Sequence, residues 1–353
     1  DYTKAIGLDP KLTTAFYGRG LAWREKGDYD RAIADFDRAI ELNPNYAAAY
    51  TNRGLAWDEK GEYDRAIADY DRAIGLDPNY AEAYYNRGLA WHEKGEYDKA
   101  IEDFNKAIKL DPKDAGAYNN RGNAWAAKGN YDKAIEDFNK ALELNPKDAG
   151  AYSNRGNVWA DKGEYDRAIA DYDRAIELNP KLAKAYNNRG SAWYEKGEYD
   201  KAIADYTKAI ELNPKLTTAF YGRGLAWRSE GEFDKAVEDF NKVTELNPED
   251  ATPFHSRGVV LAMKGEYDRA IADYDRAIEL KPNYAGAYNN RGNAWREKGD
   301  YDKAIADYDR AIELFEREGD RKNAAAAYYL SLIHISEPTR PLYISYAVFC
   351  LQK

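Results

Sequence analysis

The sequence predicts an all-α solenoid in which short antiparallel helix pairs stack one after another. A proline returns at an unbroken interval of 34 residues, nine times in a chain of 353 residues, and a strict interval of this length is typical of stacked copies of one small unit. Within each interval, apolar residues recur three and four positions apart, which is helical spacing. The prolines are Pro10, Pro44, Pro78, Pro112, Pro146, Pro180, Pro214, Pro248 and Pro282.

The first helix of a unit is illustrated by residues 47–60. Tyr50, Gly54 and Trp57 follow one another at helical spacing, and Gly61 ends the helix because glycine tolerates the left-handed conformation that follows a helix C-terminus. All tryptophans of the chain occupy the slot of Trp57, and Leu261 fills it in the remaining unit. Each unit therefore opens with one helix of the same design.

The second helix of the same unit covers residues 63–76. Tyr63, Ala66 and Tyr70 lie on one apolar stripe, and the helix stops before Pro78 because a residue that precedes proline avoids the α region. Gly54 and Ala66 are small enough to let the two helices approach closely. One such pair buries too little apolar surface to fold alone, so we expect stacking to be obligatory.

The unit AYxNRGxAW…KGEYDRAIADYDRAIELNP resembles the tetratricopeptide repeat, with that family's small residues, aromatics, internal glycine and terminal proline at matching places. The resemblance covers residues 13–318 as nine tandem units and implies a right-handed superhelix whose first helices line a concave groove. It further implies a protein-interaction scaffold that binds an extended peptide or partner segment. The alternative is the substrate-targeting region of a larger enzyme, such as a glycosyltransferase, whose catalytic domain is missing. One departure is the arginine before Gly54, where the broad family usually has leucine.

The repeat fails at both ends of the chain. Residues 1–12 match the truncated end of a second helix, and residues 1–24 reappear at 205–228 with two differences, which fits either duplication or an assembly artefact. We expect the true N-terminus to be missing and the uncapped ends to be open to self-association.

The C-terminal end departs further from the repeat. Residues 319–329 begin a further repeat, and residues 330–353 share no feature with any unit. This tail is similar to the translated read-through of a sequencing adapter, a recurrent contaminant in metagenomic proteins; an evolved apolar cap or the start of another domain are the alternatives. No function is assigned to Cys350, His334 or the segment of Pro338 and Pro341.

Composition argues against several function classes. The net charge is −10, whereas nucleic-acid binding needs clustered Lys and Arg, and no apolar run is long enough to span a bilayer. A single cysteine, Cys350, excludes an intrachain disulfide and a cysteine-based zinc cluster, and it is compatible with the cytoplasm. The sequence contains no HExxH, P-loop or dinucleotide motif. We expect no metal, no cofactor and no catalysis by the repeats.

The sharpest candidate contacts for a partner are asparagines on the first helices, each just before the repeated arginine. A carboxamide carries both a donor and an acceptor, so a row of asparagines could pair with the backbone of an extended peptide. Family members that bind peptides, and glycosyltransferase-associated members, use an asparagine at this place. The alternative is that these side chains satisfy local backbone groups. Gly18, Gly222 and Ser256 interrupt the row, which comprises Asn52, Asn86, Asn120, Asn154, Asn188 and Asn290.

Two neighbouring slots vary from unit to unit: the residue before this asparagine and the residue after the tryptophan. Such variation fits a specificity surface, and neutral drift on a solvated face explains it equally. Amides in units four and five add to the candidates, and Lys184 matches one basic place of the clamp that holds chaperone C-terminal tails. The companion lysine is absent, so we do not expect a true clamp. The additional candidate peptide contacts are Tyr85, Asn119, Asn123, Asn157, Asn187 and Lys184.

Every unit pairs the repeated arginine with an aspartate just before the second-helix aromatic, as Arg53 and Asp69 illustrate. Opposite charges that recur in step predict a ladder of salt bridges between the two helices of each pair. The alternative is a basic stripe that binds an acidic ligand.

Overall fold

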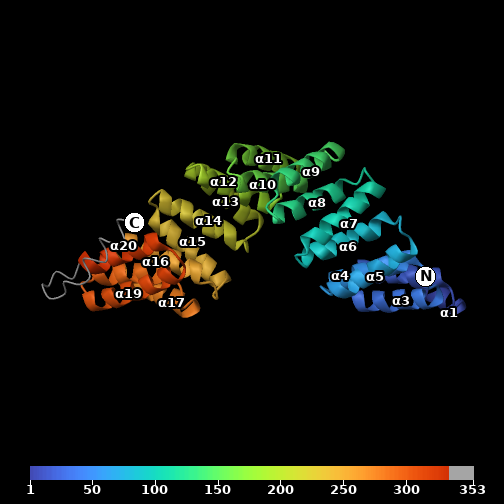
Figure 1. Ribbon diagram of the computed structural model, residues 1–353, viewed down its shortest axis with the longest axis horizontal. Helices are drawn as coiled ribbons and strands as arrows, with labels where there is room; N and C mark the ends of the chain where they lie inside the picture. The colour runs from blue at the N-terminus through green and yellow to red at the C-terminus, as the bar shows by residue number, and fades with distance from the viewer. Residues whose placement is uncertain (334–353) are drawn as a thin grey trace. The chain divides into compact units, whose positions relative to one another are not determined.

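The computed structural model describes residues 1–333, and these residues form twenty helices and no strand (Figure 1). They belong to two compact units, Asp1–Pro180 and Lys181–Lys353. The tail after Ile333, to which we assigned no function, lies outside the described residues. An all-α array of helix pairs is therefore confirmed, whereas the division of the chain at residues 12, 318 and 329 stays a prediction.

Unit 1 begins with the short helix α1 (Tyr2–Leu8) and continues as five helix pairs. The first helices of the pairs are α2 (Thr13–Glu25), α4 (Ala47–Glu59), α6 (Ala81–Glu93), α8 (Ala115–Ala127) and α10 (Ala149–Asp161). The second helices are α3 (Tyr29–Leu42), α5 (Tyr63–Leu76), α7 (Tyr97–Leu110), α9 (Tyr131–Leu144) and α11 (Tyr165–Leu178).

Unit 2 contains four complete pairs and one further first helix. Its first helices are α12 (Ala183–Glu195), α14 (Thr217–Ser229), α16 (Ala251–Met263), α18 (Ala285–Glu297) and α20 (Arg321–Ile333). Its second helices are α13 (Tyr199–Leu212), α15 (Phe233–Leu246), α17 (Tyr267–Leu280) and α19 (Tyr301–Arg317).

The helix ends follow from local sequence. Gly61 has φ of +74°, and the N–H of Glu62 donates to the carbonyl of Trp57 at 2.9 Å, which closes the C-terminus of α4. Asp77, before the proline, is extended and ends α5. In α19 a glutamate, Glu316, stands where the proline recurs elsewhere, and the helix continues to Arg317.

The core is shared between consecutive pairs, as α6, α7 and α8 illustrate. Phe104 of α7 is fully buried and packs with Ala124 of α8, between Trp91 and Trp125. A Cβ on Gly88 would lie 2.8 Å from the Phe104 ring, so glycine lets this ring rest on the backbone of α6. Consecutive pairs thus share one core cluster, as expected of stacked repeats.

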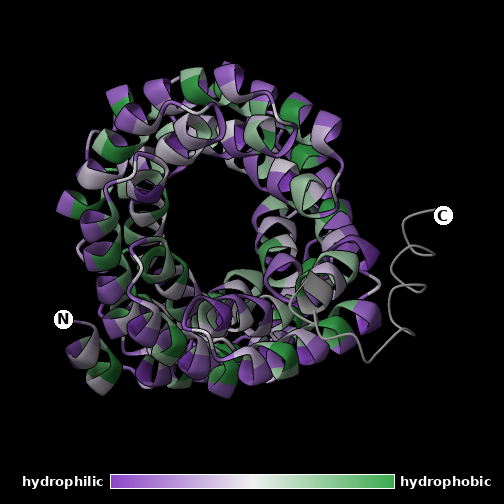
Figure 2. Ribbon diagram, turned by 90° about the vertical axis from the view of Figure 1, so that its left-hand side faces the viewer, coloured by the Kyte–Doolittle hydropathy of each residue, from purple (hydrophilic) through white to green (hydrophobic). Residues whose placement is uncertain are grey.

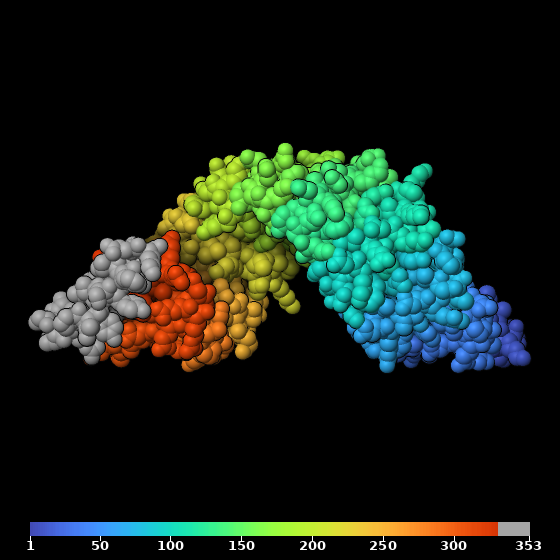
Figure 3. All heavy atoms as spheres, in the orientation of Figure 1, coloured from blue at the N-terminus to red at the C-terminus, as the bar shows by residue number. Residues whose placement is uncertain are grey.

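The same arrangement accounts for the polarity of the surface. Hydrophobic and hydrophilic residues alternate along the helices, because each helix buries only one stripe (Figure 2). Within unit 1, the atoms of successive pairs form one continuous packed body (Figure 3). The first helices also contact one another, α2 with α4, α4 with α6, α6 with α8 and α8 with α10. These first helices therefore form a surface of their own.

Candidate functional site

The predicted salt-bridge ladder is present in every complete unit. Between α4 and α5, Arg53 donates from Nε to Asp69 Oδ2 at 2.8 Å and from Nη2 to Asp69 Oδ1 at 2.5 Å. The same two-pronged contact joins α2 to α3, α4 to α5 and so on through α18 and α19. Its members are Arg19–Asp35, Arg53–Asp69, Arg87–Asp103, Arg121–Asp137, Arg155–Asp171, Arg189–Asp205, Arg223–Asp239, Arg257–Asp273 and Arg291–Asp307.

Within each compact unit, the ladder arginines that follow another pair also reach that preceding pair, which the sequence pattern did not lead us to predict. Nη1 of Arg53 donates to Asp37 of α3 at 2.5 Å, and Nη1 of Arg121 donates to Asn105 of α7 at 2.6 Å. The Arg53 guanidinium thus joins its own helix α4 to α5 of the same pair and to α3 of the preceding pair. A polar acceptor recurs two residues after each ladder aspartate, and this regularity is the signal that could have predicted the contact. The arginines are engaged in structure rather than free for an acidic ligand.

Burial governs the electrostatics of the ladder. It raises the pKa of the Asp69 carboxyl, and the hydrogen bonds from Arg53 oppose this rise. The pKa of Arg53 is raised, chiefly by its hydrogen bond to Asp69, so the guanidinium stays charged. Taking both charges out of water is costly, and the pair contributes mainly by fixing how the helices dock.

Most asparagines of the predicted row hydrogen-bond to the preceding first helix. Each such carboxamide spans to the variable slot 35 residues earlier, and we call this contact a rung. The rungs are Asn52 Nδ2 to Tyr17 Oη at 3.0 Å, Asn120 Nδ2 to Tyr85 Oη at 2.8 Å, Asn154 Nδ2 to Asn119 Oδ1 at 3.2 Å and Asn290 Nδ2 to His255 Nε2 at 2.9 Å. Where Ser256 replaces the asparagine, its hydroxyl meets the Tyr221 hydroxyl at 3.0 Å. These bonds join side chains of neighbouring first helices, whereas the predicted alternative was contact with local backbone groups, which Asn52 also makes with the Ala48 carbonyl at 2.8 Å. Contact with a ligand stays a prediction.

The rung is missing between Asn86 and Thr51 and between Gly222 and Asn187. Asn86 faces the short Thr51, whose hydroxyl donates to the Ala47 carbonyl instead, and Nδ2 of Asn86 has no partner among the described residues although Asn86 is 5% exposed. Gly222 stands 35 residues after Asn187, where an asparagine would form the rung to it. The Oδ1 atom of Asn187 is therefore buried and unpaired within the described part of the chain. A change in one unit therefore leaves a polar atom of its neighbour without a partner.

The other candidate residues are placed as follows. Asn187 donates from Nδ2 to Asn188 Oδ1 at 3.0 Å. Asn157 accepts from the Tyr172 hydroxyl at 2.8 Å, whereas Asn123, whose counterpart neighbour is Phe138, has no polar partner within residues 1–333. Lys184 is exposed in the first turn of α12.

Asp58, in the slot after the tryptophan of α4, was not among the predicted contacts. Its Oδ2 accepts from the Tyr70 hydroxyl at 2.6 Å, and its Oδ1 is buried without a partner in residues 1–333. Burial raises the pKa of this carboxyl to about 6. An apolar environment around an acidic side chain is visible only once the helices are stacked.

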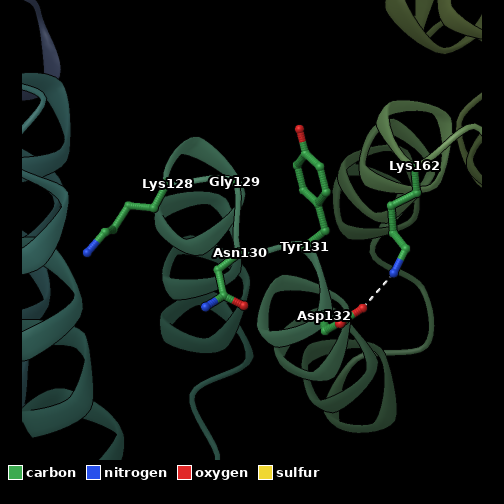
Figure 4. A pocket seen from close by; sticks show the side chains of 6 residues that line it. All are labelled: Lys128, Gly129, Asn130, Tyr131, Asp132 and Lys162. Carbon is green, nitrogen blue, oxygen red and sulfur yellow. Dashed lines mark hydrogen bonds and ion pairs between the residues drawn. The ribbon is translucent and has the colours of Figure 1, made fainter.

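The turns inside the pairs form shallow hollows that repeat with the scaffold. One of about 320 Å³ is lined by residues 128–132 and Lys162, where Lys162 pairs with Asp132 at 2.5 Å and Lys128 points away (Figure 4). Another of about 340 Å³ is lined by residues 26–30 and Lys60, three intervals earlier. Because the hollow recurs with the interval, it belongs to the stacking design rather than to a particular site.

The described residues hold no group of three or more His, Cys, Asp or Glu placed to bind a metal ion. None of the helices described here combines the length and apolar composition needed to cross a bilayer.

Comparison with protein families gives matches along most of the chain. Models described as tetratricopeptide repeat match residues 1–47, 17–81 and 58–115, and residues 115–148, 183–216, 218–250 and 285–317. A model described as TPR repeat matches residues 156–197 and 263–295. No curated protein matches the sequence.

Solved structures share the fold. A tetratricopeptide repeat protein from Parabacteroides merdae is 23% identical over 70% of this chain and 98% of its own, with a TM-score of 0.57. PilF of Pseudomonas aeruginosa is 21% identical over 60% of this chain and 96% of its own, with a TM-score of 0.53. YrrB, described as a TPR protein with an unusual peptide-binding site, is 29% identical over 53% of this chain and 97% of its own, with a TM-score of 0.44.

Proposed function

Because this chain belongs to the tetratricopeptide repeat family and is a protein-interaction scaffold, we propose that it binds an extended peptide segment of a partner along the surface of its first helices. The repeats form a fold that is generally non-catalytic, and binding is the activity that such a surface supports. The proposal concerns where the peptide lies and which side chains hold it.

One observation supports the proposal above the others. Three buried polar atoms in the described residues have no hydrogen-bond partner: Asp58 Oδ1, Asn86 Nδ2 and Asn187 Oδ1. Buried polar groups are nearly always paired, so each exception calls for an explanation. All three lie on first helices, α4, α6 and α12, in the asparagine row or in the variable slots beside it. A peptide backbone supplies both donors and acceptors, which is what these two acceptors and one donor lack.

The rungs divide the asparagine row into two groups. Asn52 donates to Tyr17 and to the Ala48 carbonyl, and it accepts from Arg24 at 2.6 Å, so its carboxamide is occupied. Asn86 and Asn123 lack such partners within the described residues. We therefore propose that Asn86 and Asn123 contact the peptide in unit 1, while the rung asparagines hold the helices that present them.

Peptide display followed by measured affinities tests the proposal. Random 12-residue peptides are selected against the full chain, and an enriched peptide is labelled for fluorescence anisotropy. Replacing both Asn86 and Asn123 by alanine removes two hydrogen-bonding side chains that the structure itself does not use. We expect the dissociation constant to rise about tenfold, which corresponds to roughly 1.4 kcal/mol.

The matched control is Asn79→Ala, which removes an exposed carboxamide from the turn between α5 and α6. It should leave the affinity unchanged. The proposal is wrong if no peptide is enriched, or if the Asn86/Asn123 double variant binds as tightly as the Asn79 variant does. Alanine at the rung residue Asn120 is a poorer choice, because it would disturb helix docking and binding together.

A further inference from the structure

Unit 2 contains a pocket that the repeat pattern does not generate. Its volume is about 370 Å³, a size that suits a side chain or small ligand. It lies among α12, α14 and the start of α16, with α13 and α15 behind. Its walls include Asn187, Tyr194, Glu195, Tyr221, Asp250 and Pro253. Unlike the hollows at the turns, it lies where the sequence departs from the repeat, because Gly222 stands in the slot that asparagine fills in most units.

The change is the loss of one rung. In unit 1, Asn154 of α10 donates to Asn119 of α8 at 3.2 Å. At the corresponding place in unit 2, Gly222 of α14 lies 35 residues after Asn187 of α12, so no carboxamide fills the space between the helices. The Oδ1 atom of Asn187 consequently stays buried without a partner in the described part of the chain.

A tyrosine from the second helix occupies part of this space. A Cβ on Gly222 would lie 2.5 Å from Tyr206 Cζ, so the ring covers the glycine backbone. The Tyr206 hydroxyl meets the Ser191 hydroxyl at 3.1 Å, and burial raises the pKa of Tyr206 to about 12. This phenol is a neutral floor for the pocket and leaves the acceptor of Asn187 unsatisfied.

The rim of the pocket is acidic. Glu195 is exposed and makes no ion pair or hydrogen bond with any described residue. Asp250 caps α16 by accepting from the Thr252 N–H at 2.9 Å. Among the residues that the structure describes, none of those lining the pocket is a lysine, an arginine or a histidine. The pocket therefore carries negative charge without a counter-ion on its walls.

Apolar surface complements these acceptors. Tyr194 and Tyr221 are half-buried, and Leu225, which is also half-buried, adds aliphatic surface. Tyr221 is held in place by its ring contact with Phe240 at 5.6 Å between centroids. Flat aromatic walls with a carboxylate and a carboxamide oxygen nearby match a planar cation on an aliphatic stem.

Resting on the proposed function, we propose that this pocket binds the side chain of an arginine in the partner peptide. The guanidinium donates to Asn187 Oδ1, which replaces the missing rung, and to the carboxylate of Glu195. Its methylenes and its plane pack against Tyr194 and Tyr221. Arginine suits the pocket better than lysine, because it offers several donors in a fixed plane and stacks on aromatic rings.

The experiment uses the same 12-residue display selection against the full chain. Enriched peptides are resynthesised with each arginine replaced by citrulline, which keeps the shape and removes the charge. We expect one position to be fixed as arginine, and its citrulline form to bind about tenfold more weakly. If no peptide is enriched, the proposed function itself fails. If peptides are enriched without a fixed arginine, or citrulline binds equally well, the pocket inference alone fails.

Two variants test whether this pocket causes the preference for arginine over citrulline, and a third variant serves as the control. Gly222→Asn should restore the rung to Asn187 and fill the pocket. The combination of this asparagine with Tyr206 already occurs 34 residues earlier, as Asn188 with Tyr172. Glu195→Gln removes the carboxylate that is proposed to meet the guanidinium, leaves Asp250 in place, and tests the inference even if the Gly222 variant is unstable. In both variants, the citrulline peptide should bind less than about twofold more weakly than the arginine peptide, as judged by their dissociation constants. Glu93→Gln changes the corresponding residue of α6 and should leave the preference for arginine over citrulline unchanged. If that preference persists in both pocket variants, the inference is wrong.

Discussion

The replacement Asp137→Asn tests how the salt-bridge ladder holds the array. Asp137 accepts from Nε of Arg121 at 2.8 Å and from Nη2 at 2.5 Å, and its side chain is 8% exposed against 19% for Arg121. The third contact of Arg121 is the neutral Asn105. The variant therefore leaves a largely buried guanidinium without any carboxylate.

The structure sets the size of the effect. Removing one partner of a buried pair costs about 3–5 kcal/mol, and since part of Arg121 reaches water, we expect roughly 2–3 kcal/mol. Asp69→Asn is the matched comparison, because Arg53 keeps a second carboxylate, Asp37, which is 48% exposed. A half-exposed ion pair contributes about 0–1 kcal/mol, so the loss at Asp69 should be smaller by up to that amount.

Hydrogen exchange resolves the result by helix, which suits an array whose units open locally. In Asp137→Asn, amides of α8 and α9 should exchange faster by the predicted free energy, while amides of α2 and α3 should keep their rates. Equal losses for both variants would show that the contact to the preceding pair contributes nothing. An unchanged opening free energy for α8 and α9 would refute the view that the ladder holds the helices.

Three further predictions follow from single contacts. Because the folded state binds the Asp58 proton more tightly than the unfolded chain, with a pKa near 6 against 3.8, stability should fall as pH rises through that window. Asp58→Asn should abolish this dependence and raise the free energy of unfolding by about 1–3 kcal/mol at pH 7.5. If the melting temperatures of the two proteins change equally with pH from 4 to 8, the prediction is wrong. Gly88→Ala should cost about 1–2 kcal/mol in urea unfolding despite better helix propensity, because the new Cβ meets Phe104 at 2.8 Å; a more stable variant would show that the ring can move freely. Asn120→Ala should cost about 1–2 kcal/mol and speed exchange in α6 and α8, because the Tyr85 hydroxyl loses its donor; unchanged exchange there would deny the rung a structural role.

Sequence alone predicted the scaffold well because its determinants are local. Gly61 ends α4 through its own backbone conformation, and Pro78 stops α5 through the residue before it. The pairing of Arg53 with Asp69 was also predictable, since opposite charges recur in step and each needs a partner when helices pack. Features of this kind depend on residues within one unit.

The candidate site was harder to predict, because it depends on contacts between units. Periodicity identified Asn120 as recurrent, but it did not tell whether the carboxamide meets a ligand or Tyr85 of the preceding unit. The contact of Arg121 with Asn105 was missed for the same reason. The unpaired state of Asp58 Oδ1 follows from burial by neighbouring helices, which no single unit encodes.

In this array, the hydrogen bonds between neighbouring first helices use polar side chains that would otherwise be available to a ligand. When every unit has the asparagine and its partner, the polar groups of the first helices are used up in holding neighbours together. A polar group is left unpaired where one slot departs from the pattern, as at Thr51 beside the Asn86 donor and at Gly222 beside the Asn187 acceptor. If the proposed function is right, recognition depends on pairs of slots 35 residues apart rather than on single recurrent positions. Under the proposed function, exchanging Thr51 for tyrosine should pair Asn86 in a rung and weaken peptide binding, whereas replacing Tyr85 by threonine should free Asn120 to contact a peptide.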